Sequence, residues 1–212
     1  MQSAVEISGL TKIINSNIIL DNISLTIPQG AICGIIGKNG SGKSMLFKCI
    51  SNLIIHDKGT IKVMGHTIDH NFINNNVMGV LIERPGFVPF YNSVKNLSLL
   101  ASLHIPIVSE DEIIAILESV GLNASDSKPI KKYSSGMIQR LGIAAACLGF
   151  PKVIILDEPT NNIDREGSKE ILNLIKHLNQ SMNCTFLLSS HNDMEIKEIC
   201  SMTVELEKGK IL

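Results

Sequence analysis

Apolar residues recur along this chain with two different periods, and the period changes from one segment to the next. Residues 5–10 alternate between apolar and polar positions, and residues 20–27 do so less regularly before a Pro-Gln-Gly turn. Alternation is typical of strands with one buried face, and proline and glycine interrupt such strands. Residues 59–68 predict a hairpin that turns near Gly65. The first third of the chain is therefore expected to be rich in β-structure.

Four short segments are apolar at nearly every position, which indicates strands that are buried on both faces. They are residues 31–36, 77–82, 153–156 and 185–189. Other segments repeat their apolar residues every three or four positions, which is the helical period. The predicted helices are residues 45–50, 93–103, 109–120, a stretch from about 134, 166–178 and 193–200, and short strands are expected at 204–206 and 210–212. Strands that alternate with helices predict a largely parallel sheet, interrupted by a helical insertion over residues 85–150 or so.

Composition and charge narrow the class of protein. The chain has 212 residues, of which 44% are hydrophobic and 18% charged, so it can bury a sizeable core and is not expected to be disordered. The net charge of −1 and the single adjacent basic pair, Lys131-Lys132, argue against nucleic acid as a partner. The five cysteines are odd in number and form no C-x-x-C pair, which favours reduced thiols and a cytoplasmic location.

No segment of the sequence predicts insertion into a membrane. The N-terminus lacks the basic and apolar regions of a signal peptide. The longest apolar stretch, residues 141–150, is too short to cross a bilayer. Any role at a membrane is therefore expected to depend on a partner protein.

The candidate chemistry begins directly after the buried strand at 31–36. Residues 37–44 spell the complete G-x-x-x-x-G-K-[ST] phosphate-binding pattern, and a predicted helix follows. Glycines let backbone N–H groups turn toward an anion, and the helix N-terminus adds unpaired amides and its dipole. Lys43 is expected to reach the β- and γ-phosphates, and the Ser44 hydroxyl to ligate Mg²⁺. The predicted nucleotide-binding residues of this loop are Gly37, Lys38, Asn39, Gly40, Ser41, Gly42, Lys43 and Ser44.

A second pattern lies at the end of the strand at 153–156, where two acids follow four apolar residues. Asp157 is placed to hold Mg²⁺ through water, and Glu158 is placed to polarise an attacking water. Paired acids after an apolar run are common on protein surfaces. With the phosphate loop upstream, however, they indicate the second half of a phosphate site.

Residues 133–140 closely precede that strand and resemble the signature motif of ATP-binding cassette (ABC) ATPases. The usual motif is Leu-Ser-Gly-Gly-Gln followed by Gln-Arg. The chain retains Ser134, Gly136 and the pair Gln139-Arg140, and it departs from the motif at Tyr133, Ser135 and Met137. Taken alone, the segment fits an ordinary capped helix equally well, because Ser-Ser-Gly often begins a helix. Its order and spacing relative to the phosphate loop favour the cassette motif.

Two further elements of the cassette follow in order. Residues 161–164 resemble the D-loop, with Asp164 at the position of its aspartate. His191 comes just after the last buried strand and resembles the histidine that contacts the γ-phosphate, whereas the other five histidines have no such context. The resemblance spans residues 5–212 or nearly so.

One departure from the family pattern carries information about the subfamily. Cassettes usually have a glutamine at the end of the strand before the helical insertion, and here Glu83 takes that position. The string Ile-Glu-Arg-Pro-Gly-Phe at 82–87 is similar to the ATPases of bacteriocin and lantibiotic self-protection exporters and of the related bacitracin-resistance type. A carboxylate is a hard ligand that suits Mg²⁺, but it adds negative charge beside the phosphates. An exposed glutamate at a hinge is the alternative interpretation.

A second departure concerns the adenine base. Cassettes usually stack the base on an aromatic residue shortly after the first strand, and the corresponding position here is about Ile14. Apolar contact is retained there but stacking is lost, so loose base selectivity is expected.

The resemblance implies an α/β fold with a P-loop NTPase core and a largely parallel sheet, an N-terminal antiparallel β subdomain and an inserted α-helical subdomain. It implies a single ABC ATPase domain over residues 1–212, with the core at 1–84 and 151–212 and the signature motif in the insertion at about 85–150. It also implies a second ATPase chain, most simply in a homodimer, and a separate membrane permease that holds the protein at the inner face of the cell membrane. ATP and Mg²⁺ are the implied cofactors, and each ATP would contact the signature residues of the partner chain, which are Ser134, Ser135, Gly136 and Met137.

The expected function is that of an ATP-hydrolysing subunit of an ABC exporter that protects against peptide antibiotics such as lantibiotics or bacteriocins. The expected catalytic residues are Lys43, Glu158 and His191, and the expected Mg²⁺ ligands are Ser44, Asp157 and Glu83. The alternatives are an importer ATPase, a soluble ABC ATPase in translation, repair or assembly, and a nucleotide-binding regulator that does not hydrolyse. A single cassette without coiled coils disfavours the soluble class, and the intact catalytic set disfavours the regulator.

Overall fold

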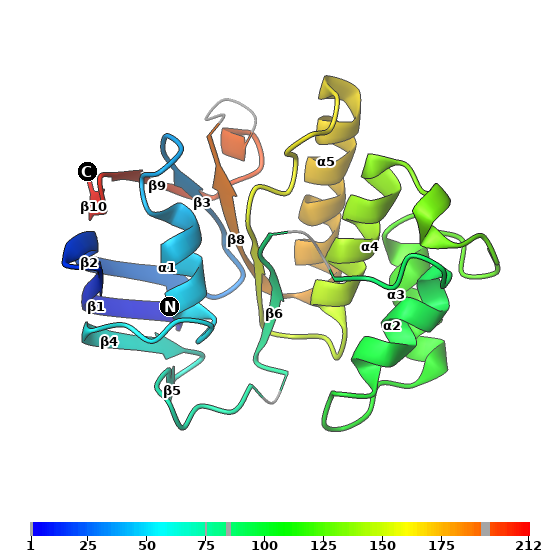
Figure 1. The fold of residues 1–212 in the computed structure, drawn as a ribbon, viewed down its shortest axis with the longest axis horizontal. Helices are drawn as coiled ribbons and strands as arrows, with labels where there is room; N and C mark the ends of the chain where they lie inside the picture. Colours follow the sequence, from blue (N-terminus) through cyan, green and yellow to red (C-terminus); the bar gives the residue numbers. More distant parts are fainter. Residues whose placement is uncertain (1, 75, 84–85, 192–195) are drawn as a thin grey trace.

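The computed structural model describes residues 2–74, 76–83, 86–191 and 196–212. Figure 1 shows most strands gathered on one side of the molecule and the helices α2, α3 and α4 on the other. The strands are β1 (Ser3–Ile14), β2 (Asn17–Pro28), β3 (Ile32–Ile36), β4 (Lys58–Val63), β5 (His66–Thr67), β6 (Met78–Leu81), β7 (Val153–Leu156), β8 (Thr185–Ser190), β9 (Met202–Glu207) and β10 (Lys210–Ile211). The helices are α1 (Lys43–Ile50), α2 (Ser93–Ala101), α3 (Glu110–Ser119), α4 (Ser135–Cys147) and α5 (Arg165–Met182), with a 3₁₀ turn at Ile130–Lys132.

The predicted parallel sheet is confirmed, with strand order β10-β9-β3-β8-β7-β6. All neighbouring pairs from β9 to β6 run parallel, and only the short β10 pairs antiparallel with β9. Side chains along β7 alternate between two hydrophobic clusters, with Ile154 and Leu156 on the face toward α4 and α5 and Val153 and Ile155 on the face toward α1. Both faces of the strand are therefore buried, which explains why its sequence is apolar throughout.

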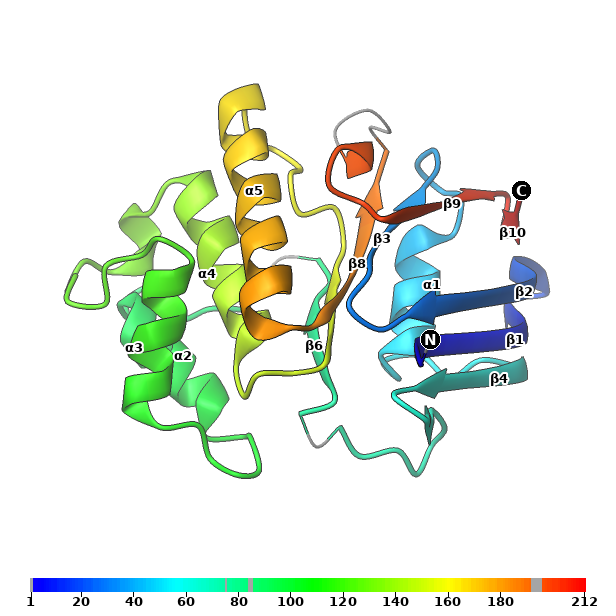
Figure 2. The ribbon, with the colours of Figure 1, turned by 180° about the vertical axis from the view of Figure 1, so that it is seen from behind.

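The N-terminal segment forms a second, antiparallel sheet of order β2-β1-β4-β5. The predicted hairpin is confirmed, because β4 and β5 are joined at Met64 and Gly65, and the φ angle of +81° at Gly65 is one that glycine adopts readily. Helix α1 lies between this sheet and the parallel sheet (Figure 2). Its buried residues Leu46 and Phe47 join the cluster formed by the inner faces of both sheets.

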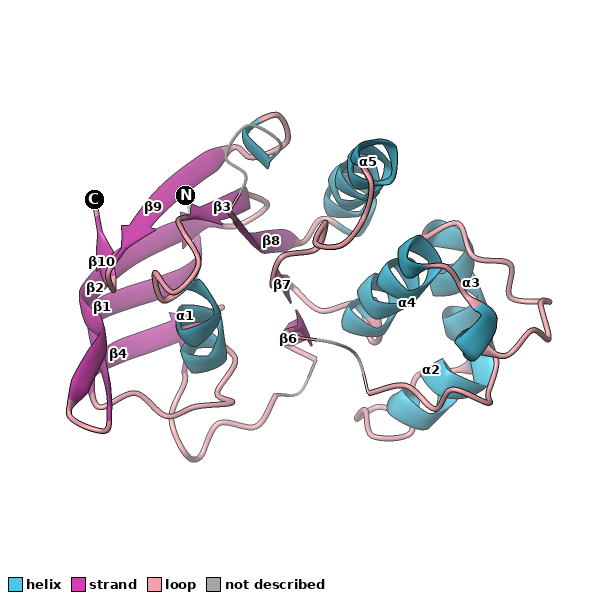
Figure 3. Ribbon diagram, turned by 45° about the horizontal axis from the view of Figure 1, so that its top comes forward, coloured by secondary structure: helices cyan, strands magenta, loops and turns pink. Residues whose placement is uncertain are grey.

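Helices α2, α3 and α4 lie between β6 and β7 in the sequence, and Figure 3 shows α4 beside the sheet with α2 and α3 on its far side, away from the strands. Helix α3 begins with a capping box in which Ser109 and Glu112 each bond the other's backbone N–H. The apolar faces of these helices pack into one cluster that continues to the underside of the parallel sheet. The helical insertion is thus joined to the core through shared packing.

Part of one predicted helix and part of the Glu83 string lie outside the described residues. Residues 193–195 of the helix expected at 193–200 are among them, and so are Arg84 and Pro85 of the string at 82–87. The next two residues of the expected helix, Ile196 and Lys197, are helical. Among the described helices, none combines the length and the apolar character that a membrane crossing needs.

All five cysteines are free thiols. Burial raises the pKa of the Cys33 thiol to about 12 and that of Cys49 to about 11. These two side chains therefore remain protonated at neutral pH and behave as small apolar residues.

Candidate nucleotide-binding site

The phosphate loop connects the end of β3 to the start of α1, as its sequence predicts. Gly42 caps α1 with a φ angle of +110°, a conformation that disfavours residues with a Cβ atom. A Cβ atom at Gly37 would lie 2.2 Å from the carbonyl oxygen of Leu206 and 2.7 Å from Oγ of Ser41. The two glycines thus allow the loop to close tightly around the helix N-terminus.

The loop has the features of an anion site. Among the described residues, no side chain caps the N-terminus of α1, so its first amides face the loop without a side-chain partner. Oγ of Ser41 is buried and has no hydrogen-bond partner within the described part of the chain. Unpaired donors at a helix N-terminus are the groups that bind phosphate in proteins, so the loop fits the polyphosphate of a nucleotide.

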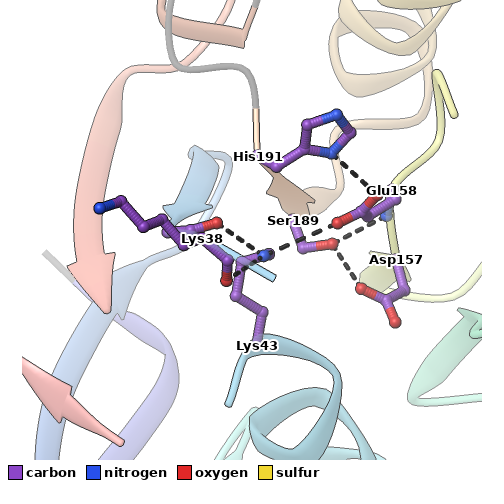
Figure 4. A network of polar contacts seen from close by, with 7 residues as sticks. Lys38, Lys43, Asp157, Glu158, Ser189 and His191 are labelled. Carbon is purple, nitrogen blue, oxygen red and sulfur yellow. Dashed lines mark hydrogen bonds and ion pairs between the residues drawn. The ribbon is translucent and has the colours of Figure 1, made fainter. Parts of the chain in front are cut away.

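The Lys43 side chain folds back over the loop and is 5% exposed. Its Nζ donates hydrogen bonds of 2.7 Å to the carbonyl oxygen of Gly37 and 3.2 Å to that of Lys38 (Figure 4). The same Nζ lies 3.6 Å from Oε1 of Glu158. Lys43 therefore links the phosphate loop to Glu158, which follows the end of β7.

Glu158 contacts both of the other predicted catalytic residues, Lys43 and His191. Its Oε2 lies 3.0 Å from Nδ1 of His191, whereas the contact with Lys43 is made by the other oxygen, Oε1 (Figure 4). Glu158 has a φ angle of +49°, an unusual value for a residue with a side chain, and such strain is found at functional sites. A carboxylate held between an ammonium group and an imidazole is positioned to accept a proton from water.

A fully buried serine that the sequence analysis did not single out joins this network. The Oγ of Ser189 on β8 donates a hydrogen bond to Oδ1 of Asp157 and accepts one of 2.8 Å from the backbone N–H of Glu158 (Figure 4). A hydroxyl within an otherwise apolar, buried strand needs a partner. Ser189 lies two positions before His191, and its need for a buried partner is the signal that could have identified it from the sequence.

A cavity of about 660 Å³ brings the predicted metal ligands together. Its lining includes Ser44 from α1, Asp157 and Glu158 from the end of β7, Glu83, and Ser135 and Gln139 from α4. The cavity lies between the core and the helical insertion, so the phosphate loop and the signature motif border one space. A smaller cavity of about 180 Å³ shares Glu158 with it and is also lined by His191 and by residues 160–163, of which 161–163 belong to the predicted D-loop.

The oxygens around the larger cavity are of the kind that Mg²⁺ prefers. Ser44 offers a hydroxyl and Asp157 a carboxylate, both hard ligands. Within the described residues, His, Cys, Asp and Glu nowhere gather in a group of three that could hold a metal ion on their own. Mg²⁺ usually completes its octahedral shell with phosphate oxygens and water, so the donor set fits a nucleotide-bound ion.

Glu83 is engaged elsewhere in this structure. Its Oε1 lies 2.6 Å from Nζ of Lys48 on α1, and this hydrogen bond lowers the pKa of the Glu83 carboxyl. The side chain is 70% exposed, and the residue has a left-handed φ angle of +65°. To ligate a metal beside Ser44, the carboxylate would have to leave Lys48.

The signature residues begin α4. Ser134 caps the helix, since its Oγ accepts a hydrogen bond of 3.2 Å from the backbone N–H of Met137. Ser134 and Ser135 are exposed, and outside its chain neighbours and its own helix backbone, a Cβ atom added at Gly136 would meet, among the described residues, the Ser134 hydroxyl alone, at 4.0 Å. The N-terminus of α4 is thus open for close approach by another molecule.

The last two predicted positions lie further out. Asp164 is exposed and stands at the N-cap of α5, where its side chain makes no capping hydrogen bond. Ile14 ends β1 at the tip of the β1–β2 hairpin and is 37% exposed. The backbone of Ile19 and the side chain of Leu20 approach the phosphate loop more closely, within 3.2 Å of a Cβ atom built at Gly42.

The comparisons with known proteins agree with this geometry. The family model described as "ABC transporter" matches residues 20–161. The chain is 36% identical over 217 residues to the bacitracin transport ATP-binding protein BcrA of Bacillus licheniformis, covering 100% of this chain and 69% of that protein. It is 34% identical over 212 residues to the lantibiotic transport ATP-binding protein SrtF of Streptococcus pyogenes, covering 98% of this chain and 89% of that protein.

Solved structures share the fold at lower sequence identity. The cbiO1 subunit of Clostridium perfringens, part of an ABC transporter complex, superimposes with a TM-score of 0.89 at 23% identity, covering 100% of this chain and 88% of that one. The dimeric ATP-binding cassette MJ0796, bound to ADP and Pi, gives a TM-score of 0.84 at 23% identity, covering 98% and 96% of the two chains. These likenesses establish the architecture.

Proposed function

This chain belongs to the family of ABC transporter ATP-binding subunits, which are ATPases, and we propose that it hydrolyses ATP at a site shared with a second cassette chain. The observation that carries the proposal is the placement of Glu158 between Lys43 and His191, next to the phosphate loop. This arrangement joins a proton acceptor, a phosphate-binding cation and a neighbouring imidazole within one network.

The residues of the core have separate roles in phosphoryl transfer. Lys43 exchanges its bonds to the loop carbonyls for the phosphate oxygens, and the buried Ser41 hydroxyl and the α1 amides supply further donors. Ser44 and Asp157 would provide oxygen ligands to Mg²⁺. When bound, the ion supplies positive charge that offsets the negative charge of the phosphate oxygens. Glu158 accepts the proton of the attacking water, and His191 keeps that carboxylate in place.

The open N-terminus of α4 supports a site completed by a partner chain. Ser134, Ser135 and Gly136 present a hydroxyl and helix-end amides to solvent, and a γ-phosphate is a suitable acceptor for them. Bound ATP would then lie between the phosphate loop of one chain and the signature motif of the other. Dimerisation would follow ATP binding, and hydrolysis would release the partner.

We assign the same chain to an exporter of peptide antibiotics, acting with a permease on a separate chain at the inner face of the membrane. Support comes from the names of the relatives, which concern bacitracin and lantibiotic transport, and from the glutamate at position 83. Deleting the gene in its host should lower the concentrations of bacitracin or a lantibiotic that stop growth. Unchanged sensitivity to both, together with purification alongside soluble proteins only, would overturn this assignment.

The shared-site proposal is tested by the substitution Glu158→Gln. Loss of the proton acceptor should reduce turnover by about 10²–10⁴-fold while leaving the donors to ATP in place. With Mg²⁺-ATP, the variant should therefore elute from gel filtration as a dimer, whereas Glu118→Gln on the exposed face of α3 should keep normal turnover. A Glu158→Gln variant that binds ATP but stays monomeric contradicts the shared site.

A further inference from the structure

We infer that Ser189 is a positioning residue that couples the metal-binding carboxylate to the general base, an inference that rests on the proposed function. Asp157 and Glu158 are adjacent in the sequence, yet the proposed function gives their side chains different roles, Mg²⁺ binding for the first and proton acceptance from water for the second. One hydroxyl contacts the side chain of the first and the backbone of the second.

The geometry leaves the hydroxyl little freedom. Ser189 is 0% exposed, on a strand that is buried along its whole length. A serine hydroxyl has one donor and two acceptor positions, so it can donate to Oδ1 of Asp157 and accept from the N–H of Glu158 at the same time. Figure 4 shows the hydroxyl between these two groups, on the side of the network away from Lys38.

The first bond controls the orientation of the Asp157 carboxylate. Holding Oδ1 restricts the rotation of the carboxylate and therefore sets the direction of its second oxygen. Asp157 lines the larger cavity together with Ser44. Partners of this kind orient metal ligands and sharpen metal affinity. Without the hydroxyl, the carboxylate can rotate away from the position that the metal requires.

The second bond stabilises the unusual backbone at Glu158. Glu158 has a φ angle of +49° two residues after the end of β7, and its backbone N–H donates a hydrogen bond of 2.8 Å to the Ser189 oxygen. A buried N–H without an acceptor is destabilising. Ser189 therefore holds in place the turn that brings Oε1 and Oε2 of Glu158 to Lys43 and His191.

Replacing a buried serine that has no contact with the site should not affect metal binding. The chain contains such a serine, which serves as a control. Ser93, at the start of α2, is also 0% exposed, and its Oγ has no hydrogen-bond partner within the described residues. The substitutions Ser189→Ala and Ser93→Ala remove the same atom from equally buried positions. Only the first removes contacts to the site.

The test measures Mn²⁺ binding to the full chain in the presence of ADP by electron paramagnetic resonance, and ATP turnover in parallel. Ser189→Ala should weaken Mn²⁺ affinity and lower kcat by about 10-fold or more, with little change in ADP affinity measured without metal. Ser189→Thr, which keeps the hydroxyl, should recover most of both losses. Ser93→Ala should match the wild-type protein in Mn²⁺ affinity and kcat.

Equal Mn²⁺ affinity and kcat in the Ser189→Ala and Ser93→Ala variants would overturn the inference. If Ser189→Ala does not fold, Ser189→Cys preserves the size of the side chain with a much weaker donor, and wild-type behaviour of that variant would overturn it equally. The proposed function fails separately, through a wild-type chain that neither hydrolyses ATP nor dimerises. Mn²⁺ binding to the ADP complex reports on Ser189 even then.

Discussion

The carboxyl edge of the parallel sheet and the N-terminus of α4 both carry predicted nucleotide-binding residues, but their surroundings differ. At the sheet edge, Glu158 contacts both Lys43 and His191, and Lys43 also donates hydrogen bonds to two loop carbonyls. At α4, Ser134 and Ser135 are exposed, and the space around Gly136 is open. The contrast indicates that the chain completes one half of a nucleotide site by itself and presents the other half outward.

Lys43→Met tests the self-contained half, and it should have the largest effect. The substitution removes the buried ammonium that lies between the loop carbonyls and Glu158, so turnover should fall by about 10³-fold and ATP affinity should fall with it. Phosphate release and nucleotide titration measure the two quantities. Lys62→Met, an exposed change on β4, should leave both near wild type, and comparable losses in the two variants would refute the role of Lys43.

Ser135→Arg tests the outward half. A bulky cation at the open N-terminus of α4 should prevent the close approach of a partner and reduce turnover by about 10²-fold, while each chain still binds ATP. Mixing this variant with Lys43→Met should restore part of the activity. In such a mixed dimer, one site combines an intact phosphate loop with an intact signature motif.

The mixing experiment separates a shared site from a site within one chain. If the signature motif acted on the phosphate loop of its own chain, neither variant would contain both intact parts, and the mixture would stay inactive. The larger cavity makes this distinction necessary, because Ser135 and Ser44 of the same chain both border it.

Glu83→Ala tests the connection between the two regions. ATP should still bind, but turnover or transport should fall by about 10-fold if the carboxylate moves from Lys48 to the metal. Lys48→Met releases the same carboxylate without removing it, so this control should retain turnover. Equal losses in both variants would show that the ion pair matters rather than a metal contact.

Ile14→Tyr should have the smallest effect. An aromatic ring at the tip of the β1–β2 hairpin would restore stacking worth about 1 kcal/mol, which corresponds to an increase in ATP affinity of about fivefold. The wild-type chain should hydrolyse ATP and GTP at similar rates, as measured by phosphate release. If the tyrosine variant matches the wild type in affinity, adenine binds elsewhere, for example nearer Ile19 and Leu20, which approach the phosphate loop.

Much of the fold could be predicted because its signals are local. Four runs of apolar residues correspond to β3, β6, β7 and β8, and the hairpin at Gly65 forms where turn residues interrupt alternating positions. The wide crossover of α2, α3 and α4 between β6 and β7 was also visible as a change of period. The order of the strands in the sheet has no such local signal, since neighbouring strands such as β3 and β8 are far apart in the sequence.

The site was predicted unevenly for the same reason. The phosphate loop, Asp157 and Glu158 form contiguous patterns whose chemistry follows from residue type and spacing. The hydrogen bond between Glu83 and Lys48 joins residues 35 positions apart in the sequence. It directs the Glu83 carboxylate toward the Lys48 side chain on α1 and not toward the expected metal position. No pattern within either segment indicates that contact.

By itself, the sequence determined the phosphate loop, the acids that follow β7 and the alternation of buried strands with helices. These features depend on backbone period and on the few residues that allow a tight, anion-binding turn, and both are properties of short segments. The tertiary structure alone decided which side chains meet: Lys48 holds Glu83, and Ser189 joins Asp157 to the backbone of Glu158 across 32 positions of chain. Such contacts arise only when strands and helices pack, because packing brings distant residues within hydrogen-bond distance of each other.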